Sequence, residues 1–314
     1  MDKRQEIYDL YWYFAYERQN IFLKKKQGLP APWTDDPILR EYKFCNSYRV
    51  NDRVSQYLLK NVIYNGQTYS SEDMLFRIIL FKLFNKESTW ELLLQNFGDI
   101  TLKTFDLKKY SKILTKAIDN NISIYNDAYI SCATKAFGYN HKHDNHLALL
   151  NKMFIDDKIQ NQIIKCQTME NAFNILKSYP LIGNFMAYQL VTDINYSNIV
   201  NWSEHEFTVA GPGAIRGIKK CFKNKGKMTN EDIIKYMYNH QDEEFKRLHL
   251  DFQRIGNRPL QLIDCQNIFC ELDKYLRKAV PSLKSNRTHI KKKYTPKKEK
   301  INYIYPPKWH IKTN

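Results

Sequence analysis

The spacing of apolar residues along the chain predicts helices almost throughout. Between residues 4 and 26 apolar side chains recur every three to four positions with charges between them, and Gly28 followed by two prolines ends the pattern. Alternating apolar and polar residues, which would indicate strands, are almost absent. We therefore predict a mainly α fold. By the same spacing, further helices are predicted over residues 47–64, 71–85, 88–96, 107–119, 124–137, 145–165 and 168–178, with a polar loop over 138–146.

The stretch YPLIGNFMAYQL, residues 179–190, predicts a sharp turn between two helices. Pro180 ends the first helix, Gly183 supplies backbone freedom for the turn, and the second helix begins near Asn184. At this helix start the backbone N–H groups of Gly183, Asn184 and Phe185 lack intrahelical acceptors and point outward with the positive end of the helix dipole. Such a helix end can bind a phosphate oxygen of DNA. A buried helical hairpin without a ligand is the alternative interpretation.

A second glycine-rich turn follows the hairpin in the segment AGPGAIRGIKK, where it opens another helix. The backbone of the turn and the basic side chains of the helix form a second candidate site for an anion, although solvated surface charges would give the same pattern. The phosphate-loop motif GxxxxGK[ST] occurs nowhere in the chain, so kinase chemistry on that scaffold is not supported. The candidate DNA-binding residues of this segment are Gly211, Gly213, Arg216, Lys219 and Lys220.

Five segments of the chain together resemble a known family. They are WYFAYERQNIF, PAPWTDDPILREYKFCNSYRVNDR, YPLIGNFMAYQLVTDINYS, EFTVAGPGAIRGIKK and DCQNIFCELDKYLR, and they extend over roughly residues 5 to 280. The family comprises the helical domain of the 5-hydroxymethyl-deoxyuridine DNA kinases of phage thymine-hypermodification systems and its relatives, the α-glutamyl/putrescinyl thymine pyrophosphorylases. The hairpin followed by an acid is also similar to the helix-hairpin-helix DNA glycosylase superfamily. The resemblance implies a helix-hairpin-helix, DNA-glycosylase-like helical fold.

The resemblance also implies a function directed at DNA. The kinases phosphorylate 5-hydroxymethyl-uracil in DNA, and the pyrophosphorylase-type relatives replace the activated group with an amine. Because the chain has no phosphate loop, we expect it to transfer an amine or amino acid onto an activated base. Two alternatives stay open: a glycosylase that removes a modified pyrimidine, and a non-catalytic DNA-binding helical subunit. The expected partners are modified DNA, an amino acid or polyamine co-substrate and a separate DNA base kinase, with no cofactor and no membrane.

Displacement at the exocyclic carbon of a base requires a base outside the stack and a carboxylate that accepts a proton from the amine. The carboxylates nearest the two turns are Asp193, Glu204 and Glu206. Glu206 is the favoured candidate because it lies closest to the glycine-rich turn. Ordinary acids, solvated or at a helix end, are the alternative interpretation.

Aromatic residues near the N-terminus could stack on a flipped base, and neighbouring Asn and Arg side chains could form hydrogen bonds with the edge of that base. A helix near residue 270 adds an acid and a lysine three positions apart, which are neighbours on a helix surface. A structural network of ion pairs accounts for the same residues equally well. The candidate base-pocket residues are Glu17, Arg18, Trp33, Asp36, Phe44, Asn46, Arg49, Asp52, Arg53, Glu271 and Lys274.

The net charge of +16 favours a polyanionic partner, with nucleic acid ahead of an anionic membrane. Lysine and arginine crowd residues 284–300, which predicts a flexible basic arm over 284–314 after one compact domain over 1–283. Scattered cysteines without a CxxC pair, no signal peptide and no apolar run of membrane-spanning length predict the cytoplasm of a bacterium or a phage-infected host. The histidines in the predicted loop have no matching cysteines, so no metal site is expected.

Overall fold

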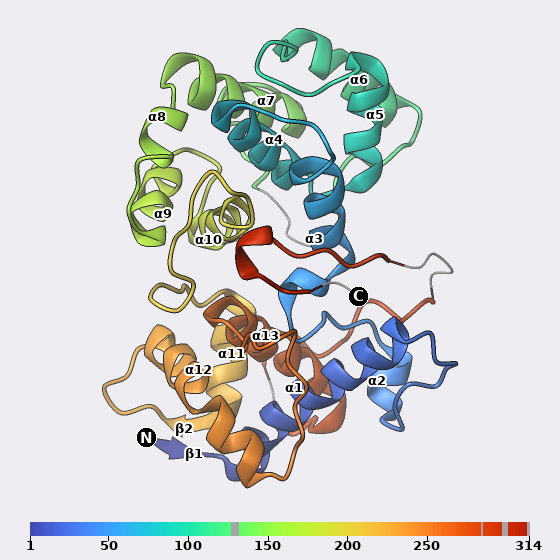
Figure 1. The fold of residues 1–314 in the computed structure, drawn as a ribbon, viewed down its shortest axis with the longest axis vertical. Helices are drawn as coiled ribbons and strands as arrows, with labels where there is room; N and C mark the ends of the chain where they lie inside the picture. Colours follow the sequence, from blue (N-terminus) through green and yellow to red (C-terminus); the bar gives the residue numbers. More distant parts are fainter. Residues whose placement is uncertain (127–131, 284, 297–300, 313–314) are drawn as a thin grey trace. The chain divides into compact units, whose positions relative to one another are not determined.

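The computed structural model describes residues 1–126, 132–283, 285–296 and 301–312 (Figure 1). Helices dominate this part of the chain, which confirms the mainly α class. Within it, the only sheet is the antiparallel pair of β1, Asp2–Lys3, and β2, Phe222–Asn224. The chain forms two compact units: unit 1 comprises Met1–Asp52, Glu204–Tyr303 and Ile311–Asn314, and unit 2 comprises Arg53–Ser203 and Ile304–His310.

Unit 1 is built around α1, which confirms the first predicted helix. The rings of Tyr11 and Trp12 are fully buried and meet the rings of Phe269 in α13 and Phe245 in α12, with centroid distances of 4.5 and 5.2 Å. Such aromatic pairs add stabilisation to the burial of apolar area. The helices of unit 1 are α1 (Gln5–Lys26), α2 (Pro37–Glu41), the 3-10 helix η1 (Arg49–Asn51), α11 (Pro212–Cys221), α12 (Asn230–Arg247) and α13 (Leu262–Ala279).

Unit 2 surrounds α4, a helix whose residues from Met74 to Phe84 are all buried. Ser70 starts this helix, because its hydroxyl accepts a hydrogen bond from Asp73 N at 3.0 Å. The helices of unit 2 are α3 (Arg53–Tyr57), the π-helical turn η2 (Leu58–Ile63), α4 (Ser71–Phe84), α5 (Glu87–Phe97), α6 (Leu107–Asp119), α7 (Lys142–Asn151), the π-helical turn η3 (Lys152–Asp156), α8 (Gln160–Ile163), α9 (Met169–Lys177), α10 (Asn184–Ile194) and the 3-10 helix η4 (Pro307–Trp309).

Two predictions in the middle of the chain are wrong. Residues 124–126 and 132–137 form no helix, and the rest of the helix predicted over 124–137 lies outside the described residues. The predicted polar loop is helical from Lys142 onward. Its polar side chains are buried because partners satisfy them: Asn145 accepts from Phe137 N at 2.9 Å and donates to Tyr139 O at 2.8 Å. Buried hydrogen bonds of this kind leave no apolar spacing in the sequence.

The C-terminal residues contribute to both units. Residues 292–294 pair with residues 41–43 in unit 1. In unit 2, the ring of Trp309 meets Tyr196 edge-on, and Lys308 Nζ donates to Ser197 O at 3.0 Å and Val200 O at 2.8 Å. Among the described residues, no helix is both long enough and apolar enough to cross a membrane.

Candidate nucleic-acid interface

The helical hairpin of unit 2 consists of α9 and α10, which confirms the sharp turn predicted between two helices. Thr168 starts α9, because its hydroxyl accepts a hydrogen bond from Asn171 N at 3.2 Å. Within the turn, Leu181 has a left-handed φ of 68°, whereas Gly183 has an ordinary φ of −85°. The expectation that Gly183 supplies the backbone freedom is therefore wrong. Leu181 adopts the conformation that usually favours glycine.

The start of α10 is open to solvent. Gly183 and Asn184 are exposed and Phe185 is partly buried. Ala187 N donates to Gly183 O at 2.9 Å, so the helix begins at Gly183. Among the described residues, the N–H groups of Gly183 and Asn184 have no acceptor. This helix end can therefore receive an anion.

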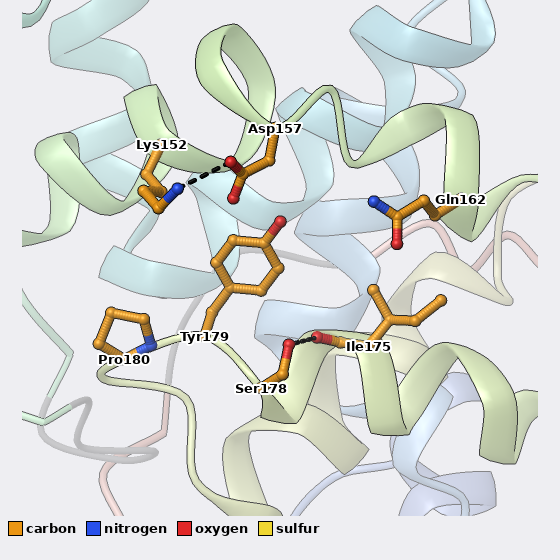
Figure 2. Close-up of a pocket in the computed structure, with 7 residues that line it drawn as sticks. All are labelled: Lys152, Asp157, Gln162, Ile175, Ser178, Tyr179 and Pro180. Atoms are coloured by element: carbon orange, nitrogen blue, oxygen red, sulfur yellow. Dashed lines mark hydrogen bonds and ion pairs between the residues drawn. The ribbon is translucent and has the colours of Figure 1, made fainter.

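A cavity of about 480 Å³ lies beside the hairpin, at the end of α9. Figure 2 shows the ring of Tyr179 reaching toward Asp157, which accepts a hydrogen bond from Lys152 Nζ at 2.7 Å. Burial, together with the hydrogen bond to Asp157, raises the pKa of Tyr179 to about 12. The phenol is therefore a neutral donor at physiological pH. The cavity is lined by Lys152, Asp157, Gln162, Ile175, Ser178, Tyr179 and Pro180.

Asp193, one of the three candidate catalytic acids, lies inside unit 2. It is 2% exposed, and its carboxylate contacts the ammonium of Lys82 at 2.9 Å. Lys82 comes from the buried face of α4 and is 3% exposed. The pair joins α10 to α4, and this geometry gives Asp193 a structural partner in place of solvent.

The glycine-rich turn of unit 1 allows α11 to approach α13 closely. A Cβ at Gly213 would lie 2.2 Å from Cys270 Sγ, and one at Gly217 would lie 2.1 Å from Phe269 O. A side chain at either position would therefore displace its neighbour. These two glycines thus allow the close contact between α11 and α13, a packing role that for Gly213 is in addition to the predicted contact with an anion. Gly211, the residue before α11, is buried. The backbone N–H of Ala210, one residue earlier, donates a hydrogen bond to the Glu231 carboxylate at 2.8 Å.

Asp273 of α13 gathers the basic residues of α11. Its buried carboxylate contacts Arg216 Nε at 3.0 Å and Lys220 Nζ at 3.0 Å, and it also accepts from Arg277 Nη2 at 2.7 Å. Burial works against the charged form, yet the hydrogen bonds from these three cations lower the pKa of Asp273. Lys219, in contrast, is exposed. Of the predicted phosphate contacts on α11, Lys219 alone is fully available at the surface of the described chain.

The two acids that precede the glycine-rich turn differ in environment. Glu204 is half-buried and forms an ion pair with Arg258. Glu206 is exposed and has no side-chain hydrogen bond or ion pair within the described residues. His205 between them stacks on the ring of Tyr238 at 6.1 Å. Glu206 is therefore the one of the pair that can reach an external partner.

Several candidate base-pocket residues hold the segment between α2 and η1 in place. Arg18 Nε donates to Cys45 O at 2.9 Å, and its Nη2 donates to Phe44 O at 3.1 Å. Glu271 accepts from Cys45 N at 2.9 Å and from Lys274 Nζ at 2.6 Å. These contacts fit the alternative of a structural network, and the proposed contact with a base stays a prediction.

Three other candidates contact protein groups of unit 1. Asp36 caps α2 and accepts from Tyr275 OH at 2.5 Å. The ammonium of Lys274 lies 4.5 Å from the ring centroid of Phe44. Trp33 packs edge-on against Tyr294. Arg49 is buried and Glu17 half-buried in unit 1, whereas Arg53 begins α3 in unit 2.

Two acids of unit 1 accept hydrogen bonds from the backbone near η1. Asp52 accepts from Asn46 N at 2.8 Å, and Asp264 accepts from Arg49 N at 2.8 Å and Gln261 N at 2.9 Å. Burial raises the pKa of each carboxyl to about 6, and these backbone donors oppose the shift. Both carboxyls therefore bind a proton at higher pH than an ordinary aspartate does.

No group of three or more potential metal ligands occurs among the described residues. The histidines of α7 instead have protein partners, since His143 meets Thr115 at 2.9 Å and His146 meets Tyr125 OH at 2.8 Å.

Comparison with known proteins identifies the family. A model of the helical domain of 5-hmdU DNA kinase matches residues 5–285. The chain belongs to this family. A 5-hmdU DNA kinase of Bacillus phage SP10 is 26% identical over 326 residues, which cover 96% of this chain and 50% of that protein. The chain thus spans about half the length of this curated relative. No solved structure matches it.

In this member of the family, the sequence did not reveal the residues that pair with the candidate site residues. Lys82 pairs with Asp193, and Arg258 pairs with Glu204. Asp273 pairs with Arg216. A lysine inside the apolar run RIILFKLF was the available signal for Lys82. For Asp273, the acid four positions before Arg277 on one helix face was such a signal.

Proposed function

We propose that this chain binds DNA and takes part in the hypermodification of thymine positions that carry 5-hydroxymethyl-uracil. The observation that carries the proposal is the match of residues 5–285 to the helical domain of 5-hmdU DNA kinase. The net charge of +16 supports a polyanionic partner. The open helix start at Gly183 and Asn184 supports contact with a phosphate.

In the proposed complex, the start of α10 contacts the DNA backbone. Backbone N–H groups bind phosphates irrespective of base sequence, so this contact positions the protein without selecting the base. Lys219 at the surface of α11 adds a second phosphate contact within unit 1. A DNA base kinase that supplies the phosphorylated base is the proposed protein partner. The support is that this chain matches only about half of the 5-hmdU DNA kinase of Bacillus phage SP10.

Transfer of an amine or amino acid onto the activated base is the finer proposal. Glu206 supports it, since an exposed carboxylate without a protein partner in the described chain is free to accept a proton from an attacking amine. Asp193 and Glu204 have cationic partners in their own units, which supports structural roles. The glycosylase reaction would instead use one of these acids to stabilise a sugar cation.

One experiment separates these functions. The protein is incubated with a duplex that contains 5-hydroxymethyl-uracil, its pyrophosphorylated form or thymine, each with and without a mixture of amino acids and polyamines. Nucleosides are then analysed by mass spectrometry, and binding is measured by fluorescence anisotropy on the same duplexes. An amine adduct on the pyrophosphorylated duplex alone supports transfer, free base supports a glycosylase, and binding without either supports a DNA-binding domain. Failure to bind any of the duplexes would refute the proposed function.

A further inference from the structure

The C-terminal segment 285–296 pairs through its backbone with the end of α2 and the two residues that follow it in unit 1. Residues 41–43 and 292–294 pair antiparallel through two N–H···O=C hydrogen bonds of 2.8 and 3.1 Å. Tyr42 and Lys293 face each other in this pairing. Part of the segment that composition predicts as a flexible arm is therefore held beside the C-terminal end of α2 (Figure 1).

An aromatic clamp fixes the same segment to the end of α1. Lys25 Nζ donates to Tyr294 OH at 3.0 Å and lies 4.3 Å from the ring centroid of Tyr294 and 4.5 Å from that of Trp33. Cation–π contacts of this kind add to the attachment. Burial and the neighbouring Arg18 lower the pKa of Lys25 to about 8, as expected for an ammonium covered by rings.

This attachment gathers exposed lysines from three parts of the sequence. We call them the lysine ridge: Lys24 and Lys26 of α1, Lys43 after α2, and Lys291 of the C-terminal segment. The nearby acid Glu41 is already paired with Lys293 at 3.2 Å. The ridge thus carries an excess of positive charge, which favours a polyanionic partner.

We infer that the lysine ridge is a preformed binding surface for the sugar–phosphate backbone of DNA. The inference rests on the proposed function and adds its location and its rigidity. Because Lys25, Trp33 and Tyr294 hold the segment before DNA arrives, little chain entropy is lost on binding, in contrast to a free arm. Lysine contacts with phosphates carry no sequence information, so the ridge determines affinity and salt dependence without selecting the base.

The first test removes charge from the ridge and, as a matched control, from another part of unit 1. The triple variant Lys26→Gln/Lys43→Gln/Lys291→Gln is compared with Lys223→Gln/Lys227→Gln/Lys246→Gln, which changes three other exposed lysines. The dissociation constant for a duplex with 5-hydroxymethyl-uracil is measured over a range of salt concentrations. The ridge variant should reduce the slope of log K against log salt by about 0.9 per lost contact, hence by up to about 2.7, and the control should change it little.

Equal losses in both triple variants, or none in the ridge variant, would overturn the ridge while leaving DNA binding by the chain established. Absence of binding by the wild-type protein would remove the proposed function and the ridge with it. These two failures are therefore distinguishable.

The second test distinguishes a fixed surface from an arm that must detach. Tyr42→Cys/Lys293→Cys replaces two residues that face each other across the antiparallel pairing, at a spacing that suits a disulfide. The oxidised protein, with the cross-link confirmed by peptide mapping, is compared with its own reduced form. Affinity should agree within about twofold, roughly 0.4 kcal/mol on the scale of 1.4 kcal/mol per factor of ten. A loss of tenfold or more on oxidation would show that the segment has to leave α2 to bind DNA.

Discussion

Two side chains of opposite charge, Lys82 and Asp193, lie inside unit 2 almost without contact with water. Removing ions from water costs several kcal/mol per ion, and the mutual attraction at 2.9 Å offsets much of that cost. Substitution of one residue leaves the other as a buried charge without a counter-ion, whereas substitution of both by apolar residues leaves no buried charge. The ion pair therefore makes a clear prediction about stability.

Asp193→Asn should lower the free energy of unfolding by about 3–5 kcal/mol, whereas Lys82→Met/Asp193→Leu should recover most of the loss. Urea unfolding at pH 7 measures both. If Asp193→Asn is as stable as the wild type and loses only turnover, the acid is catalytic and our structural interpretation fails.

The raised pKa of Asp52 predicts how the stability of the protein changes with pH. The pKa of Asp52 is raised in the folded protein to about 6, above the value of an unfolded aspartate, so the folded state binds more protons between these two values. The contribution of Asp52 to stability is then fully present below the unfolded pKa and is lost as the pH rises through about 6. In Asp52→Asn, which keeps an oxygen to accept from Asn46 N, the decline in stability should be smaller by on the order of 1 kcal/mol between pH 5 and 8. Urea unfolding at several pH values provides the comparison, and parallel pH profiles for the two proteins would contradict it.

Glu206 makes a prediction about chemistry. Glu206→Gln retains the shape of an exposed side chain and removes its charge, so stability and DNA affinity should stay near those of the wild type. Amine incorporation into the pyrophosphorylated duplex should fall by about a hundredfold or more. Glu204→Gln serves as a contrast, since loss of its pairing with Arg258 should appear in stability first. Full turnover in Glu206→Gln would exclude this residue as the base.

At the scale of elements, the contact between α11 and α13 depends on residues that have no side chain. Gly213 lies under Cys270, and Gly217 lies under the carbonyl of Phe269. A thiol can move to another rotamer, whereas a helix carbonyl cannot move without displacing the helix. Substitution at these two positions should therefore differ in severity.

Gly213→Ala should lower the free energy of unfolding by about 1–3 kcal/mol, because the new methyl group overlaps Cys270 Sγ. The double variant Gly213→Ala/Cys270→Ala should regain much of this loss. Gly183→Ala is the matched control, since a Cβ there meets no atom within 4 Å. Thermal and urea unfolding of the three variants test the prediction, which fails if Gly213→Ala is as stable as Gly183→Ala.

Helices whose apolar face points to a core were predictable from sequence, as α1, α4, α6 and the α9–α10 hairpin illustrate. The start of α7 was not, because Asn145 and its neighbours are buried by hydrogen bonds that apolar spacing does not record. The sequence indicated which charged residues could bind DNA, but it did not indicate which protein groups those residues contact. Arg216 and Lys220 look like phosphate ligands in sequence, and only the three-dimensional contact with Asp273 reveals where their charge is used.

At the scale of the whole molecule, the short segment 304–310 belongs to unit 2 although it is more than one hundred residues from the rest of that unit. Its attachment depends on Trp309 and on Lys308, whose ammonium donates to two backbone carbonyls. Charged hydrogen bonds and an aromatic edge contact are both lost when this segment is removed.

Truncation after Tyr303 should therefore lower the stability of unit 2 by on the order of 2 kcal/mol. DNA binding through the lysine ridge should persist, because residues 285–296 remain. Hydrogen exchange of α10 measures the first effect and anisotropy the second. Unchanged exchange in α10 would mean that the segment contributes nothing to the stability of its unit.

The division of unit 1 into distant pieces of sequence has a consequence for synthesis. Met1–Asp52 contains α1, but its partners α12 and α13 come after residue 204. On the ribosome, the buried face of α1 must wait while some 150 residues of unit 2 are made. During that interval Tyr11 and Trp12 have no Phe269 or Phe245 to cover them. Nascent chains halted before residue 260 should therefore expose the apolar side of α1 to chaperones, and the completed α13 should end that exposure.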